Sequence, residues 1–191
     1  MLWINTNRII AFMKNKFSFR QCQECDLPKL VAVYREYVKT NLKMDTPIDE
    51  STFKRDGFGN KFNVQIAICD SNSDIAGFAV WQNVYDLHWG VSGGDVIDLY
   101  VDIPYRGYGL APMMLSSVAK SIQKRGGVFL AGQGLENETK PAELYQKIAM
   151  GIPGVNCILG GKAFRVFAEL EGKSIREFVN GLPPKEWNHL P

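Results

Sequence analysis

The stretch from Val96 to Ala111 constrains the fold more than any other part of the chain. Residues 95–102 form an apolar strand pattern, a turn containing glycines follows, and residues 111–124 repeat apolar side chains at helical spacing. A strand that passes through a glycine-bearing turn into a helix start is the local structure of many anion sites. We therefore expect a strand–turn–helix unit at the centre of the domain.

The turn itself has the pattern Arg106-x-x-Gly109-x-Ala111. The first turn of a helix leaves its N–H groups unpaired and carries partial positive charge, so it stabilises an anion. Gly107 and Gly109 have no Cβ, which lets the backbone approach phosphate oxygens closely, and Arg106 can add a charge-assisted contact. The pattern predicts a diphosphate site, although the same spacing alone also occurs in ordinary turns.

Length and charge limit the class of protein. With 191 residues, we expect one domain over residues 14–191, preceded by an extension over residues 1–13. The net charge of +2, with no long basic run, gives no indication of nucleic-acid binding. We find no apolar run of the ~18 residues that a membrane span needs, and expect no membrane association.

The four cysteines bear on the compartment. Cys22-x-x-Cys25 could be half of a zinc site or a redox pair, but no second pair of Cys or His stands at ligand spacing. We interpret the cysteines as reduced thiols of a cytoplasmic protein and expect no metal.

The order of the remaining elements predicts an α+β domain with one parallel step in its sheet. Asp26 is the expected N-cap of the first helix, and Ser92-Gly93-Gly94 the expected turn into the central strand. The expected strands cover residues 17–21, 62–69, 75–85, 95–102, 128–131 and 163–170, and the expected helices begin near residues 27, 46, 111, 141 and 174.

The chain resembles the GNAT acetyltransferases over residues 17–170. The block from Asp98 to Ala111 looks like the strand and pyrophosphate loop of that family. Downstream, Pro141-Ala142-Glu143-Leu144-Tyr145-Gln146-Lys147 looks like its Ala-x-x-Leu-Tyr-x-Lys helix. The resemblance implies the GNAT acyl-CoA N-acyltransferase fold, a mixed, mostly antiparallel twisted sheet flanked by helices.

The resemblance also implies roles for individual residues in binding acetyl-CoA and transferring its acetyl group. Tyr145 would protonate the leaving thiolate, and Asn137 is nearest to the family's Asn before the late helix, although not in register with it. The pantetheine arm would lie along Leu99, Tyr100 and Val101, and the pyrophosphate on Arg106, Gly107, Tyr108, Gly109, Leu110 and Ala111.

Two other departures from the family concern the acceptor. The usual Gly-Phe after the late helix is replaced by a glycine-rich break over residues 149–154. Polyamine acetyltransferases of the family place a Glu where this chain has Ile97, so a polyamine acceptor is not indicated.

An amine must lose a proton before it attacks a thioester, and a carboxylate usually takes that proton. Asp98 and Asp95 are the candidates; being three residues apart, they face opposite sides of a regular strand unless a bulge intervenes. We favour Asp98, with His88 as a further possible base. An aromatic wall for a cationic acceptor could be formed by Trp81, Tyr85, Asp86 and His88, although hairpin packing explains the same residues.

The sequence therefore predicts an acetyl-CoA-dependent N-acetyltransferase that moves an acetyl group to a primary amine by direct attack in a ternary complex. The acceptor would be a small molecule or a protein amine, and a homodimer is possible. The alternative is a GNAT-like module that binds CoA or a protein partner without efficient chemistry.

Overall fold

The computed structural model describes residues 16–132. Contacts between Cα atoms divide the chain into Met1–Leu135 and Glu136–Pro191, and every described residue lies in the first unit. The expected elements near residues 141, 163 and 174, and the extension over residues 1–13, lie outside the described residues.

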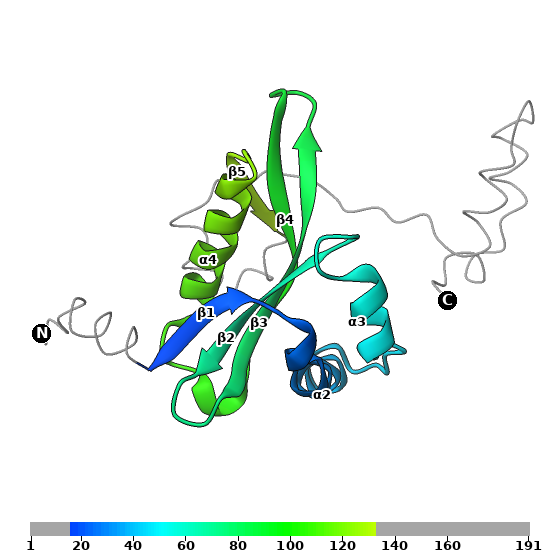
Figure 1. Cartoon of the computed structure of the whole chain (residues 1–191), viewed down its shortest axis with the longest axis vertical. Coiled ribbons are helices and arrows are strands. Elements are labelled where there is room, and N and C mark those ends of the chain that lie inside the picture. Colours follow the sequence, from blue (N-terminus) through cyan, green and yellow to red (C-terminus); the bar gives the residue numbers. More distant parts are fainter. Residues whose placement is uncertain (1–15, 133–191) are drawn as a thin grey trace, which may run out of the picture. The chain divides into compact units, whose positions relative to one another are not determined.

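The described part is a sheet of strands in the order β1-β2-β3-β4-β5, with helices on both faces (Figure 1). Strands β1 to β4 pair antiparallel, and β5 pairs parallel with β4 after the crossover helix α4. The strands are β1 (Phe17–Gln21), β2 (Asn63–Cys69), β3 (Asp74–Asp86), β4 (Val91–Val101) and β5 (Phe129–Gly132). The helices are α2 (Leu27–Tyr37), α3 (Glu50–Asp56) and α4 (Leu110–Lys124).

The two faces of the sheet carry different helices because successive side chains of a strand point to opposite sides. Phe78 and Val80 of β3 pack with Leu30 and Tyr34 of α2 in one core. Ala79 and Trp81, the alternate residues, pack with α4 in another. A site on β4 therefore faces either α2 or α4, depending on the position of its residue along the strand.

Helices α2 and α3 both form where the sequence predicts a helix, but α3 begins later than expected. Asp26 precedes α2 as expected, but its carboxylate accepts from Arg20 at 2.6 and 2.8 Å rather than capping the helix. At α3 the N-cap is Asp49, whose Oδ1 accepts from the Thr52 N–H at 2.8 Å, so the helix begins after Pro47 rather than at it. Helix α2 continues into a π-helical turn over Val38–Leu42, a distortion often found near functional sites.

The prediction that Ser92-Gly93-Gly94 forms a turn is wrong. These residues lie inside β4, and the chain turns earlier, where Gly90 has φ +68° and donates to the Asp86 carbonyl. The glycines are needed for close packing instead. A Cβ on Gly93 would lie 2.5 Å from the Phe129 ring, and one on Gly94 would lie 2.3 Å from Ile122 Cδ1.

We expect Gly77→Ala to lower the free energy of unfolding by about 1–3 kcal/mol, the usual cost of overpacking. A Cβ on Gly77 would lie 2.6 Å from the Tyr100 carbonyl oxygen, so β4 would have to move. Urea unfolding measures the change. Gly132→Ala is the matched control, because its Cβ meets no atom of residues 16–132 closer than 3.5 Å. Equal stability of the two variants would contradict the expectation.

Candidate functional site

A β-bulge in β4 brings two carboxylates to one face of the sheet. Val96 pairs with Trp81 and Asp98 pairs with Val80, so Ile97 is an extra residue without a partner on β3. Asp95 pairs with Gln82, two residues from Val80. Asp95 and Asp98 therefore lie on the same face, rather than on the opposite faces of a regular strand.

Asp98 lies under helix α2 and receives hydrogen bonds from two phenols. The Tyr37 hydroxyl donates to Oδ1 at 2.7 Å, and the Tyr34 hydroxyl donates to Oδ2 at 3.2 Å. Burial raises the pKa of both phenols, and the Asp98 carboxylate raises each further. Both hydroxyls therefore remain protonated donors throughout the neutral range.

The apolar periodicity of the sequence over α2 places Tyr34 and Tyr37 on one helix face with Leu30, Val33 and Val38, as core residues. Both are indeed buried, at 9% exposure each. Their spacing of three residues places them side by side on the helix, with both hydroxyls able to reach one group. This spacing was the available signal, but the acceptor is on a strand more than sixty residues away, which no local pattern identifies.

Among residues 16–132, the parallel partner of β4 ends at the bulge, and no described strand pairs with that side of β4 beyond Val96; we call this the open side of β4. The parallel pairing of β4 with β5 covers Gly93 to Val96, and β5 ends at Gly132 in the described chain. The Asp102 N–H donates to the Ala76 carbonyl, and alternation along an antiparallel pair then turns the backbone groups of Tyr100 toward β3. The N–H and C=O groups of Leu99 and Val101 point to the open side.

The loop after β4 presents unpaired amides at the N-terminus of α4. Gly107 has φ +83° and Gly109, the residue before the helix, has φ +72°. No described residue accepts from the N–H groups of Gly107, Tyr108 or Gly109, and the first N–H groups of α4, those of Leu110 and Ala111, have no partner within the helix. Space for a Cβ at Gly107 is open, so a ligand can approach the backbone there.

Arg106 lies beside this loop, with its side chain turned back toward β4. Its Nε donates to the Val101 carbonyl at 3.0 Å, and its guanidinium lies 5.6 Å from the centre of the Tyr100 ring. The contact confirms that the Val101 carbonyl faces the open side of β4. It also joins the strand edge to the amide-rich loop in one continuous surface.

The structure does not bring the aromatic segment of the β3–β4 hairpin to Asp98. Trp81 is only 1% exposed and packs against α4, where the Arg125 guanidinium lies 5.0 Å from its ring centre. Tyr85 pairs with Ser92, six residues before Asp98, which places it roughly 20 Å along the strand. Asp86 accepts from the His88 amide within the exposed turn.

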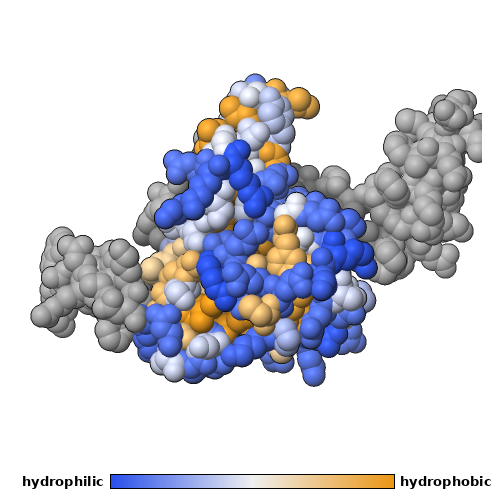
Figure 2. Space-filling model, viewed as in Figure 1, coloured by the Kyte–Doolittle hydropathy of each residue, from blue (hydrophilic) through white to orange (hydrophobic). Residues whose placement is uncertain are grey.

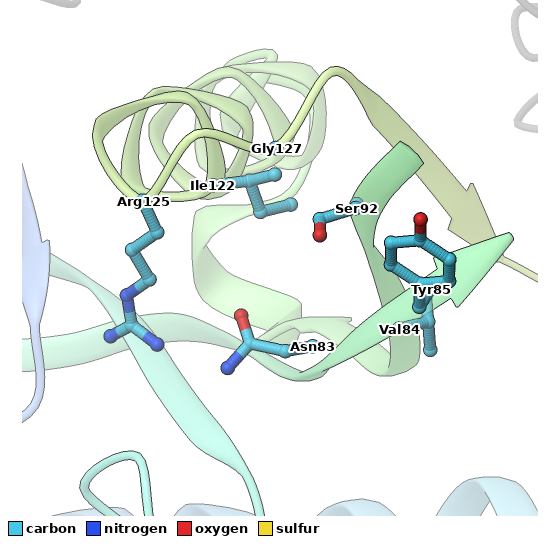
Figure 3. A pocket seen from close by; sticks show the side chains of 8 residues that line it. Asn83, Val84, Tyr85, Ser92, Ile122, Arg125 and Gly127 are labelled. Atoms are coloured by element: carbon cyan, nitrogen blue, oxygen red, sulfur yellow. The ribbon is translucent and has the colours of Figure 1, made fainter. Parts of the chain in front are cut away.

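The hairpin tip contributes to other surface features. Figure 2 shows apolar side chains gathered there; Tyr85, Leu87 and Trp89 are 59%, 84% and 59% exposed. A hollow of about 400 Å³ lies next to it, with Arg125 on one side and Tyr85 on the other (Figure 3). It adjoins the C-terminal end of α4, about 22 Å along the helix from the loop amides.

The cysteines of the described residues are free thiols. Burial raises the pKa of Cys22 to about 12, which makes that thiol unreactive. No group of His, Cys, Asp and Glu within residues 16–132 could hold a metal ion. None of the helices in the same range is long and apolar enough to cross a membrane. Tyr145 and Asn137 lie outside the described residues, so their roles stay predictions.

The fold matches that of solved acetyltransferases. A ribosomal-protein-alanine N-acetyltransferase from Brucella melitensis is similar, with a TM-score of 0.59 and 16% identity over 76% of this chain and 99% of that one. An aminoglycoside acetyltransferase from an uncultured soil metagenomic sample gives 0.63 and 15% over 77% and 99%. An acetyltransferase from Trypanosoma brucei gives 0.56 and 18% over 76% and 99%.

The chain therefore has the GNAT acetyltransferase fold, as the sequence resemblance implied. At these identities the likeness is one of structure. No family model matches the sequence, and no curated protein matches it.

Proposed function

We propose that this protein is an acetyl-CoA-dependent N-acetyltransferase acting on a primary amine. The observation that carries the proposal is the edge of β4 that no described strand pairs. It runs from a hydrogen-bonded carboxylate at the bulge to the amides before α4, which no described residue pairs with. A thioester with a diphosphate at the far end of its arm needs both features in that order.

The described residues fit acetyl-CoA by the chemistry of their donors. The Val101 N–H and C=O and those of Leu99 are directed to the open side and suit the amides of a pantetheine arm. The amides from Gly107 to Ala111 suit the diphosphate, because a helix N-terminus favours negative charge. The backbone groups of Tyr100 are directed toward β3, and its ring is buried against Tyr37 and Phe78, so we assign Tyr100 no contact with the arm.

The acceptor arrives as an ammonium ion, and Asp98 would take one proton from it. The free amine then forms a bond to the thioester carbonyl carbon, the C–S bond breaks, and the leaving thiolate takes a proton from a phenol. The attacking nitrogen gives up its second proton as the amide forms, and this proton restores the phenol, so that one proton in all leaves through Asp98. A backbone N–H near Val101 would stabilise the oxyanion during the attack. We assign the thiolate's proton to Tyr145, on the resemblance of residues 141–147 to the family helix.

For Tyr145→Phe we expect turnover to fall about 100-fold or more, the usual contribution of a positioned acid, with acetyl-CoA affinity retained. The lost hydroxyl is the proposed proton source for the thiolate, whereas phenylalanine retains the aromatic ring. Rates measured across the neutral and alkaline range, with acetyl-CoA titration alongside, test this. Turnover equal to that of the parent protein at every pH would show that Tyr145 is not the acid.

The proteins of similar structure include a ribosomal-protein-alanine N-acetyltransferase and an aminoglycoside acetyltransferase. Both acceptors are amines, so a small amine or a protein amine is the class we propose here. The carboxylates Asp95 and Asp98 on one face favour a cationic acceptor. A catalytically weak CoA-binding or protein-interaction module is the alternative, and it would bind acetyl-CoA without consuming it.

Calorimetric titration with acetyl-CoA tests the first part of the proposal. We expect saturable binding that free CoA displaces, because the loop amides contact the diphosphate common to both. A flat titration with folded protein would contradict the proposal and its CoA-binding alternative.

A further inference from the structure

The Asp98 carboxylate is held by more hydrogen bonds from the protein than a carboxylate at the surface requires. Both of its oxygens accept a hydrogen bond, Oδ1 from Tyr37 and Oδ2 from Tyr34, so the plane of the carboxylate is fixed at two points. An oxygen that accepts one hydrogen bond still has a second lone pair. The carboxylate can therefore be oriented by the helix and still accept a proton.

The phenols are themselves immobilised by aromatic neighbours. The Tyr37 ring lies 5.6 Å from that of Phe78 and 5.1 Å from that of Tyr100. The Tyr34 ring packs edge-on against Phe53 at 5.6 Å. These ring contacts hold each hydroxyl in position independently of its hydrogen bond to Asp98. The two phenols therefore orient the carboxylate, and the carboxylate does not orient the phenols.

The energetics favour a purpose beyond satisfying two buried hydroxyls. A neutral acceptor or a water molecule would satisfy a phenol at lower cost than a half-buried charge, whose desolvation is unfavourable. Here a bulge in β4 delivers a carboxylate to the phenols at the point where the strand opens. A carboxylate at that place therefore indicates a role that requires its negative charge.

We propose that Tyr37, assisted by Tyr34, is a positioning residue that holds the Asp98 carboxylate in the orientation in which it accepts a proton from the incoming amine. The inference rests on the proposed N-acetyltransferase function. Tyr37 holds the shorter bond and is the stronger of the two. Because their own hydroxyls stay protonated, neither phenol takes the proton; it leaves Asp98 by the open side.

Tyr37→Phe separates this role from simple packing. Losing the Tyr37 hydroxyl removes the hydrogen bond that holds Oδ1 of Asp98, while the ring and its aromatic neighbours remain. We expect kcat to fall about tenfold because the proton acceptor is less well oriented, with acceptor KM and acetyl-CoA affinity little changed. A loss of packing alone would lower stability without this separation of kcat from KM.

The matched variants are Tyr34→Phe, expected to give a smaller fall in kcat, and Tyr105→Phe, which loses a hydroxyl bonded to Asn72 at 3.1 Å and should leave kcat unchanged. An unchanged kcat in Tyr37→Phe, with only a lower unfolding midpoint, would overturn the inference. If Asp98→Asn is inactive in the same assay, such a result overturns the role of Tyr37 and leaves Asp98 as the base. Full activity of Asp98→Asn would overturn both the role of Tyr37 and the assignment of the base.

Discussion

Asp98→Asn is expected to lower kcat/KM for the amine by about 100- to 10,000-fold while leaving acetyl-CoA affinity unchanged. The amide keeps the size of the side chain and an oxygen for the Tyr37 hydroxyl, but it cannot accept a proton from an ammonium ion. Steady-state kinetics with the preferred acceptor measure the loss. Calorimetric binding of acetyl-CoA shows that the variant is folded and that the effect is on the chemistry.

Asp95→Asn is the matched control for this substitution. The bulge at Ile97 places Asp95 on the same face, but no described phenol donates to it. We expect a modest change in acceptor KM and little change in kcat. Loss of turnover in Asp95→Asn together with normal turnover in Asp98→Asn would show that the base has been assigned to the wrong carboxylate.

Gly107→Glu is expected to weaken acetyl-CoA binding by about 10- to 100-fold, which corresponds to about 1.4–2.8 kcal/mol. The new carboxylate would lie among the amides proposed to bind the diphosphate, where two like charges repel and the helix N-terminus can satisfy only one of them. Calorimetric titration measures the change in Kd.

The control for Gly107→Glu is unusually well matched. Gly126 has φ +82° against +83° at Gly107, and a Cβ at either position meets no atom of the described residues within 4 Å. Gly126→Glu therefore introduces the same backbone strain and the same charge at the opposite end of α4. Equal losses of affinity in the two variants would contradict the assignment of the loop, because backbone strain alone would then explain both.

The sequence predicted the strand–turn–helix unit well, since β4, the loop and α4 lie where the apolar pattern and the glycines place them. It misplaced the turn at Ser92-Gly93-Gly94. A glycine pair is typical of a turn, yet here the absent Cβ atoms make room for Phe129 and Ile122, which come from later elements. Packing between distant segments decided the conformation, and no local signal carries that information.

The sequence predicted only part of the candidate site, because the rest of the site also depends on packing between distant segments. Asp98 and the loop amides follow from local patterns, and the structure places both at the open edge of β4. The bulge at Ile97 depends on how β4 registers against β3, and the contacts of Tyr34 and Tyr37 depend on how α2 crosses the sheet. Periodicity assigns such tyrosines to a face of a helix but does not identify what their hydroxyls bind.

The most direct test of the central claim is release of free thiol from acetyl-CoA, measured with polyamines, aminoglycosides, amino acids, and peptides that offer a lysine or a free N-terminus. We predict release that depends on one class of amine and is lost in Asp98→Asn. No release with any of these acceptors, from protein that binds acetyl-CoA, would contradict catalysis on these amines and favour the CoA-binding module.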